Sequence, residues 1–162
     1  MESSPVFRTL FLLLLANGAP VIAKRLLGEK LAFPLDGGKL FFDGRPWFGP
    51  SKTVRGIVLS AAATAGGAIM LGLPPMMGAL FALSAMAGDL ASSFIKRRMG
   101  MPPSSMAIGL DQLPESLLPV VIYWQALGLQ PASGVVVLVL FFVGELILSR
   151  ILFHLHVRDR PY

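Results

Sequence analysis

The sequence predicts an all-α polytopic membrane protein with about five transmembrane helices and two cytoplasmic loops that form a polar site. Apolar residues make up 54% of the 162 residues and charged residues only 14%. Soluble domains are usually about 45–50% apolar and about a quarter charged. The apolar residues also lie in long blocks, and the basic residues gather between particular blocks. We therefore expect residues 1–162 to form a single integral membrane domain.

Each apolar block is expected to be a transmembrane helix, because roughly 20 apolar residues cross a bilayer core of about 30 Å. The first block is not a cleavable signal peptide, since Pro20 and the basic pair that follows it do not form a small-residue cleavage site. Small residues in the second block, from Ser60 to Gly67, predict close contact with another helix. The five blocks cover about residues 6–22, 57–73, 76–95, 117–129 and 133–155.

The basic residues predict the orientation of these helices. Lys and Arg are concentrated in two connections, about residues 24–56 and 96–114, while the connections 72–75 and 128–133 contain none. Further arginines lie towards the C-terminus, at Arg150, Arg158 and Arg160. Five spans with the N-terminus outside place nearly every positive charge inside, as the positive-inside rule requires.

We therefore expect a multi-pass protein of the cell membrane whose C-terminus and active site are cytoplasmic. Because the basic residues follow the membrane edges, the lipid bilayer and not a nucleic acid is the expected partner. The chain has no cysteine, which excludes disulfides and thiolate metal sites.

The first cytoplasmic loop contains two short motifs typical of phosphate binding. Asp36-Gly37-Gly38-Lys39 and Gly49-Pro50-Ser51-Lys52-Thr53 each combine glycine with a lysine. Glycine lets backbone N–H groups approach a phosphate, and lysine supplies positive charge. Neither motif has Walker spacing, and an interfacial loop that faces anionic lipid is the alternative. Between the motifs, Asp43-Gly44 predicts a hairpin turn.

A second polar cluster lies where the third helix ends and the fourth begins. Asp89, Ser92, Ser93 and Lys96 are spaced so that they share one helical face. An acid this close to hydrocarbon is costly without a partner, so it indicates function. Asp111 opens the fourth helix and could instead be an N-cap. Two acids at adjacent helix ends, with lysines nearby, are typical of sites where Mg²⁺ bridges nucleotide phosphates.

Several short motifs then occur together along most of the chain. They are Asn17 to Pro20, Pro34 to Gly38, Asp43 to Pro46, Lys52 to Gly56, Gly88 to Arg98 and Leu110 to Leu113. In this order they resemble the CDP-archaeol synthase family of CTP:lipid-phosphate cytidylyltransferases, and more distantly the phosphatidate cytidylyltransferases. The resemblance implies Mg²⁺-dependent transfer of CMP from CTP to a membrane lipid phosphate, either a di-ether or a diacyl glycerol phosphate. The products would be a CDP-activated lipid and pyrophosphate.

The resemblance also implies roles for individual residues. Asp89 and Asp111 are the expected Mg²⁺ ligands and, with Lys96, the expected catalytic residues. The residues expected to bind nucleotide or phosphate are Asn17, Asp36, Gly37, Gly38, Lys39, Lys52, Thr53, Arg55, Ser92, Ser93, Arg97 and Gln112.

Two acids do not fit this pattern simply. Pro114 lies where the phosphatidate cytidylyltransferase signature commonly has a second acid, and Glu115, which follows, could substitute because it shares a helical face with Asp111. Glu145, in the middle of the fifth block, would have a role if it hydrogen-bonds a neighbouring helix or lines the pocket.

Two other classes of protein remain as alternatives, and the sequence argues against a second type of enzyme. A small multi-pass transporter would have midplane ionisable residues and internal repeats. A non-catalytic lipid-binding protein would leave the two acids without a purpose. A CDP-alcohol phosphotransferase would need a dense run of aspartates, which is absent. The oligomeric state is left open by the sequence.

Overall fold

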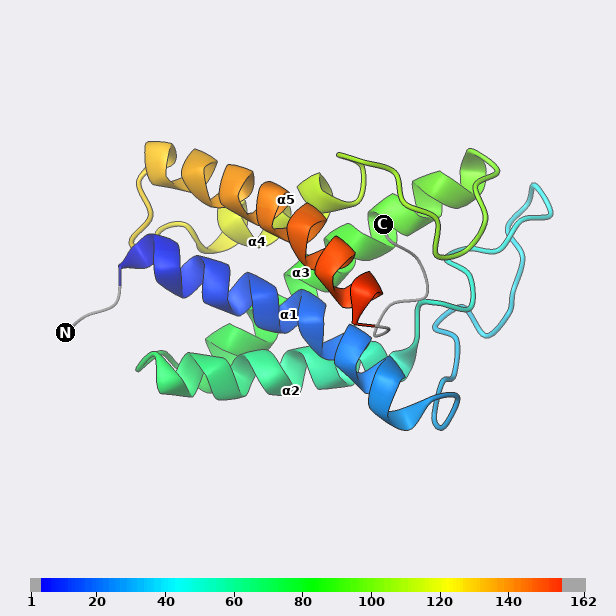
Figure 1. Ribbon diagram of the computed structural model, residues 1–162, viewed down its shortest axis with the longest axis horizontal. Coiled ribbons are helices and arrows are strands. Elements are labelled where there is room, and N and C mark those ends of the chain that lie inside the picture. The colour runs from blue at the N-terminus through cyan, green and yellow to red at the C-terminus, as the bar shows by residue number, and fades with distance from the viewer. Residues whose placement is uncertain (1–3, 156–162) are drawn as a thin grey trace.

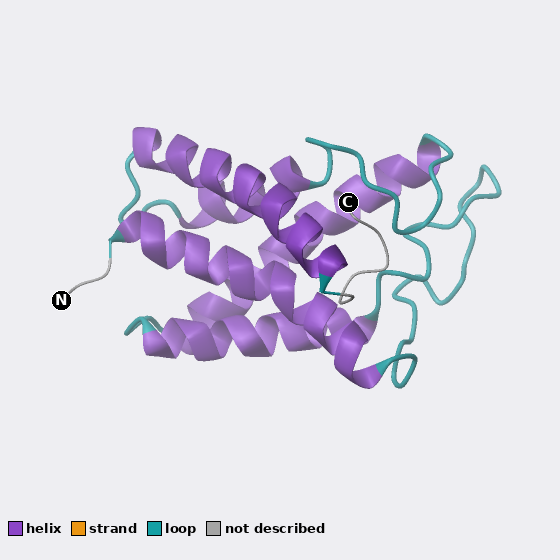
Figure 2. Ribbon diagram, viewed as in Figure 1, coloured by secondary structure: helices purple, strands orange, loops and turns teal. Residues whose placement is uncertain are grey.

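The computed structural model describes residues 4–155 and folds them into five helices (Figure 1). This part of the chain contains no strand, only two isolated bridges in the first loop (Figure 2). The expected all-α fold is confirmed. Arg158 and Arg160, which contributed to the predicted orientation, lie outside the described residues. The helices are α1 (Pro5–Leu27), α2 (Val54–Met70), α3 (Pro75–Arg98), α4 (Gln112–Tyr123) and α5 (Pro131–His154).

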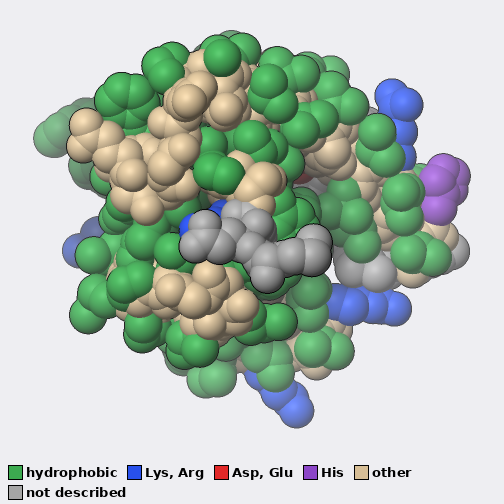
Figure 3. All heavy atoms as spheres, turned by 90° about the vertical axis from the view of Figure 1, so that its left-hand side faces the viewer, with side chains coloured by type: hydrophobic (Ala, Val, Ile, Leu, Met, Phe, Trp, Pro, Cys, Tyr) green, Lys and Arg blue, Asp and Glu red, His purple; other side chains and the backbone are tan. Residues whose placement is uncertain are grey.

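The two long loops lie at the same end of the helical bundle. Residues 28–53 and 99–111 both lie on the right in Figure 1, whereas the short α2–α3 and α4–α5 connections lie at the opposite end. Figure 3 views that opposite end, which is covered mainly by hydrophobic and uncharged groups. The fold therefore collects the polar loop residues at one end of an apolar bundle.

Within residues 4–155, three helices are long and apolar enough to cross a membrane. They are α1, α3 and α5, with 23, 24 and 24 residues and mean hydropathies of 1.8, 1.4 and 2.5. Helix α2 is apolar but has only 17 residues. Helix α4 has 12 residues, which gives a length of about 18 Å. Helix α2 is therefore at the lower limit of length for crossing a bilayer, and α4 is shorter than that limit.

Helix α4 ends earlier than the apolar sequence predicts. The expected range was 117–129, but residues 124–128 form a turn in which Gly128 has a φ of 69°. The turn is closed by hydrogen bonds such as Leu129 N–H to the Trp124 carbonyl at 2.7 Å. Leu127 and Leu129 are both buried in the main hydrophobic core. This segment is therefore apolar because its turn packs into the hydrophobic core, and not because α4 is longer.

Helix α1 continues past its predicted end at residue 22 and contains Pro20. Proline has no N–H, so the Ala16 carbonyl loses its helical partner. The Ser60 hydroxyl of α2 donates to that carbonyl at 2.7 Å. A side chain of a neighbouring helix thus satisfies the freed group, which lets a proline remain inside an apolar helix.

Small residues allow α2 to pack closely, as predicted. Ser60, Thr64 and Gly67 are buried along one side of the helix. A Cβ added to Gly78 of α3 would lie 2.5 Å from the Thr64 carbonyl oxygen, so only glycine allows this approach. Close backbone contact of this kind is a main source of helix association in lipid.

Candidate active site between the two loops

A cavity of about 630 Å³ lies at the loop end of the bundle. Its wall combines the first loop, the second loop and parts of all five helices. The wall therefore joins segments that are far apart in the sequence. Its polar residues include Asn17, Lys24, Lys52, Thr53, Arg55, Asp89, Lys96, Ser105, Asp111, Gln112, Glu115 and Glu145.

One acid–lysine pair joins the first loop to α3. The Lys52 ammonium lies 2.7 Å from Asp89 Oδ1 and 2.5 Å from Asp89 Oδ2. Both side chains are about one-fifth exposed. Lys52 is held at this point because its carbonyl accepts from Leu35 N–H at 2.8 Å. Thr53, the next residue, caps α2 by accepting from Gly56 N–H at 3.2 Å. The start of α2 thereby fixes where the lysine meets Asp89.

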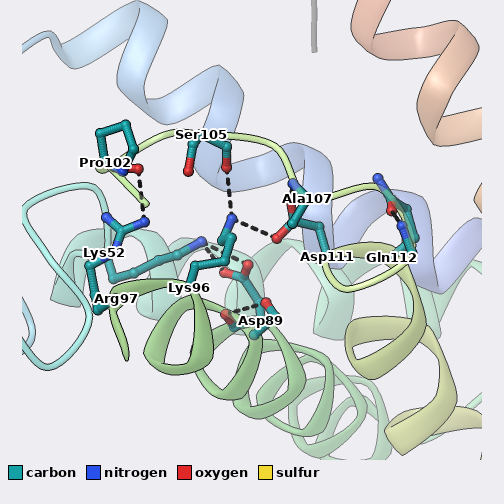
Figure 4. A network of polar contacts seen from close by, with 11 residues as sticks. Lys52, Asp89, Lys96, Arg97, Pro102, Ser105, Ala107, Asp111 and Gln112 are labelled. Atoms are coloured by element: carbon teal, nitrogen blue, oxygen red, sulfur yellow. Dashed lines mark hydrogen bonds and ion pairs between the residues drawn. The ribbon is translucent and has the colours of Figure 1, made fainter. Parts of the chain in front are cut away.

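A second pair joins the C-terminal end of α3 to the second loop (Figure 4). Lys96 Nζ lies 2.6 Å from Asp111 Oδ1 and donates to the Ser105 carbonyl at 2.8 Å. Asp111 Oδ2 accepts from Ala107 N–H at 2.8 Å. Asp111 makes no capping hydrogen bond to α4. Its carboxylate instead pairs with Lys96 and accepts a hydrogen bond from the loop that precedes the helix.

Gly88 brings the two acid–lysine pairs to the same cavity. A Cβ at this position would lie 2.1 Å from the Pro114 carbonyl oxygen and 2.7 Å from Glu115 N. Contacts below 3.0 Å are essentially absent for real Cβ atoms. Only glycine therefore lets α3 touch the first turn of α4 directly beside Asp89.

Three further residues expected in the site also line the cavity. The Arg55 guanidinium donates to the Gly28 carbonyl at 3.0 Å, which ties α2 to the end of α1. The Asn17 amide donates to the Leu13 carbonyl at 3.1 Å. Gln112 accepts from Gly109 N–H at 2.8 Å. The predicted site residues that the structure brings together are Asn17, Lys52, Thr53, Arg55, Asp89, Lys96, Asp111 and Gln112.

The Asp36 motif lies outside the cavity wall and braces the first loop. The Asp36 carboxylate accepts from the backbone N–H groups of Gly38, Phe48 and Gly49 at 3.0, 3.0 and 2.9 Å. Burial by itself would raise the pKa of Asp36, but these hydrogen bonds outweigh it and lower the pKa. Gly37 and Gly38 have positive φ, as the turn requires. The structure therefore places Asp36, Gly37, Gly38 and Lys39 outside the cavity wall, although the adjoining Leu35 hydrogen-bonds Lys52.

Three predicted residues of α3 are also absent from the cavity wall: Ser92, Ser93 and Arg97. All three are buried. The Ser92 hydroxyl donates to the Asp89 carbonyl at 2.9 Å, and Arg97 donates to the Pro102 carbonyl at 2.8 Å. The Ser92 contact lies within α3, and the Arg97 contact holds the second loop, while Nε and Nη1 of Arg97 are buried without a partner in residues 4–155. By contrast, the expected Asp43-Gly44 turn is present, closed by Phe41 N–H to the Arg45 carbonyl at 2.7 Å.

Glu115 and Glu145 line the cavity, although the sequence assigned neither a definite role. Glu115 comes from α4 and Glu145 from α5, and both side chains reach the same cavity. Glu145 thus meets one of the two conditions under which a role was expected, because it lines the pocket. Ionisable residues within apolar helices are the signal that would have identified the pair.

The chain is similar to known proteins of one family. The CarS-like family model for CDP-archaeol synthase matches residues 74–162. A CDP-archaeol synthase from Pyrobaculum calidifontis is 38% identical over 127 residues, which cover 70% of this chain and 73% of that protein. One from Thermococcus onnurineus is 42% identical over 109 residues, or 60% of this chain and 61% of that protein.

A solved structure agrees with these matches. It is described as "Structural insight into an intramembrane enzyme for archaeal membrane lipids biosynthesis". Its TM-score is 0.67 at 29% sequence identity, over 86% of this chain and 91% of that chain. Sequence and fold therefore agree that this multi-pass membrane protein is an enzyme and belongs to the CDP-archaeol synthase family.

Proposed function

We propose that this enzyme transfers the cytidylyl group of CTP to the phosphate of a membrane glycerolipid, with Mg²⁺ as cofactor. The observation that carries the proposal is the presence of two acid–lysine pairs, Lys52–Asp89 and Lys96–Asp111, on the wall of one cavity. Family membership supports it, since the relatives are named CDP-archaeol synthase. The lipid is a di-ether or a diacyl glycerol phosphate.

The reaction needs no protein nucleophile. An oxygen of the lipid phosphate attacks the α-phosphorus of CTP, and the bond from that phosphorus to the bridging oxygen of the β-phosphate breaks. The electron pair leaves with pyrophosphate, and the product is the CDP-activated lipid. Catalysis then consists of positioning the reactants and stabilising negative charge. Lys52 and Lys96 supply ammonium groups for the phosphate oxygens, and their pairing with the acids orients them towards the cavity.

The carboxylates present fit a magnesium ion bound together with its nucleotide. Within residues 4–155 no group of three or more His, Cys, Asp or Glu side chains could hold a metal by itself. Mg²⁺ usually takes only one or two carboxylates and completes its shell with phosphate oxygens and water. Asp89 and Asp111 would supply those carboxylates, and the ion would neutralise charge that develops on the triphosphate.

The position of the site supports a cytoplasmic active site. The cavity lies at the end of the bundle that carries the two basic loops. The positive-inside rule places such loops in the cytoplasm, with the N-terminus outside and the C-terminus inside. CTP would then reach the cavity from the cytoplasm, and the lipid phosphate from the adjoining leaflet.

Purified protein in detergent tests the proposal. With Mg²⁺, we expect label from CTP to enter an added lipid phosphate, and chelation by EDTA to stop the reaction. Asp89→Asn and Asp111→Asn should each lower kcat/KM at least about 100-fold, the scale of losing one electrostatic contact in an active site. Asp43→Asn is the matched control, because Asp43 pairs with Arg98 away from the cavity.

A panel of di-ether and diacyl glycerol phosphates identifies the lipid class. If both active-site variants kept wild-type activity, the assignment of Asp89 and Asp111 would be wrong. If the wild-type protein gave no CDP-lipid with any lipid phosphate, the proposed reaction itself would be wrong.

A further inference from the structure

Two arginines join the first loop to the C-terminal end of α3, outside the cavity. Arg45 of the loop donates through Nη1 to the Arg97 carbonyl at 3.3 Å and to the Arg98 carbonyl. The last carbonyls of a helix have no partner within the helix, so Arg45 satisfies groups that would otherwise face water. Gly100, just after the helix, has a φ of 76°, and a Cβ there would lie 3.4 Å from Arg45 Nη1. The loop side chain therefore lies directly on the end of α3.

Arg98 makes the reciprocal contacts from the helix to the loop. Its Nη2 donates to the Arg45 carbonyl at 3.2 Å and to the Pro46 carbonyl at 2.5 Å. Its guanidinium carbon lies 4.7 Å from the ring centroid of Phe41 and 4.9 Å from that of Phe94, distances at which a cation and an aromatic ring attract each other. We call Arg45 and Arg98 the arginine pair. Neither of them lines the described cavity.

A short segment connects the arginine pair to Lys52, whose ammonium lies beside Asp89 in the cavity. Asp89 and Arg98 are about 14 Å apart along the axis of α3, so the first loop contacts this helix at two levels. Residues 47–51 form the whole connection between them. Within it, Gly49 accepts from Lys52 N–H at 3.2 Å through its carbonyl. A shift of the loop at the arginine pair would therefore move Lys52.

The ion pair between Lys52 and Asp89 is too weak to hold the loop by itself. Its side chains are partly exposed, and ion pairs that water reaches contribute little to stability. Ordering the backbone of residues 28–53 has an entropic cost at every residue. The proposed function also assigns Lys52 to phosphate and Asp89 to the metal, which separates the two groups during turnover. Charged donors make the stronger hydrogen bonds, so the arginine pair supplies the more persistent attachment.

We propose that Arg45 and Arg98 are positioning residues, which hold the first loop on α3 so that the Lys52 ammonium stays at the cavity. They act through Lys52 and touch neither substrate. Their effect on turnover rests on the proposed cytidylyl transfer, whereas their effect on the loop does not.

A double-mutant cycle separates positioning of Lys52 from general support of the fold. Arg45→Met should lower kcat/KM for CDP-lipid formation about tenfold or more, because a small misplacement of a catalytic group is costly. The same substitution made in Lys52→Met should lower kcat/KM by less than about threefold, because no ammonium is left to position. Arg98→Met should behave in the same way. A residue that only stabilises the fold would give equal factors in both backgrounds.

Hydrogen exchange in detergent, followed by mass spectrometry, reports on the loop without any nucleotide. Arg45→Met and Arg98→Met should each speed exchange within residues 33–53 at least about tenfold, because the loop opens locally more often. Exchange within residues 57–70 of α2 should stay at the wild-type rate. The Leu35 N–H is the most informative group, because it donates to the Lys52 carbonyl.

Asp43→Asn is the matched control for both measurements. The Asp43 Oδ1 atom accepts from Arg45 N–H at 3.0 Å and lies 2.6 Å from Arg98 Nη1. Asparagine keeps an oxygen acceptor at this position, and Arg98 retains its two carbonyls and both rings. This variant should therefore match the wild type in exchange and in kcat/KM.

The outcomes separate the inference from the proposed function. Unchanged exchange in Arg45→Met would show that the arginine pair does not hold the loop. Faster exchange with wild-type kcat/KM, or equal factors in the two backgrounds, would show that the pair does not act through Lys52. Either result would overturn the inference. A wild-type protein that made no CDP-lipid would refute the cytidylyl transfer, while exchange of the Leu35 N–H would still decide whether the arginine pair holds Lys52.

Discussion

Replacing Gly88 by alanine tests whether the contact between α3 and α4 sets the geometry of the site. The added Cβ would meet three backbone atoms, at 2.1 Å from the Pro114 oxygen, 2.4 Å from its carbonyl carbon and 2.7 Å from Glu115 N. Backbone cannot rotate away as a side chain can. Since ordinary contact begins at 3.4 Å, α4 must move by about 1.3 Å relative to α3.

That displacement acts directly on the two acids, because Asp89 follows the glycine and Asp111 precedes α4. A misplacement of about 1 Å can cost about 100-fold in rate, so we expect kcat/KM for CDP-lipid formation to fall by about that factor. The strain should also lower the free energy of unfolding by about 1–3 kcal/mol. The unfolding midpoint in detergent, measured beside the activity, reports this loss.

The matched control is Gly66→Ala in α2, where an added Cβ meets nothing within 4 Å. It should retain wild-type activity and stability, because alanine is the better helix former and no neighbour must move. If Gly88→Ala were as active as the control, the close approach of the two helices would not be what places Asp89 and Asp111.

Three further changes test other parts of the account. Lys52→Met should lower kcat/KM at least about 100-fold, because it removes a cation from the cavity and leaves Asp89 without its partner, and a fully active variant would exclude Lys52 from catalysis. Ser60→Ala should lower the free energy of unfolding by about 1–3 kcal/mol, because the Ala16 carbonyl beside Pro20 loses its hydrogen bond, and an unchanged unfolding midpoint would count against this. The folded-state pKa of Asp36 is lowered, so its stabilising contribution is present above its unfolded pKa of about 3.9 and is lost as pH falls through the lower folded value. Melting curves of the wild type and Asp36→Asn should therefore differ at neutral pH and converge in strong acid, and a constant difference would contradict the assignment.

The helical fold could be predicted from the sequence because hydropathy in long blocks decides it. The ends of α1 and α4 differ from the predicted ones, because a hydrogen bond from another helix and a local backbone conformation decide them, and hydropathy reports neither. Pro20 suggests the end of a helix, but Ser60 of another helix satisfies the freed carbonyl. The apolar residues up to Leu129 suggest a longer fourth helix, but Gly128 takes a positive φ and turns the chain.

The candidate site could be predicted only in part, for a similar reason. Spacing along α3 identified Asp89 and Lys96 as residues of one face, but their partners, Lys52 and Asp111, come from two different loops. Only the folded loops set these pairings. The Asp36 motif has the composition of a phosphate cradle, yet its carboxylate is used by the N–H groups of Phe48 and Gly49. Only the contact with Gly38 is the local bond that aspartate commonly makes in a turn, and the other two depend on how the loop folds.

The fate of the phosphorus atoms of CTP tests the central claim most directly. Wild-type protein is incubated with Mg²⁺, a glycerolipid phosphate and CTP labelled at either the α- or the γ-phosphorus. Cytidylyl transfer predicts that the α-label enters the lipid and the γ-label is released as pyrophosphate, with both signals reduced at least about 100-fold in Asp89→Asn. Entry of the γ-label into the lipid, or α-labelling that survives Asp89→Asn unchanged, would contradict it.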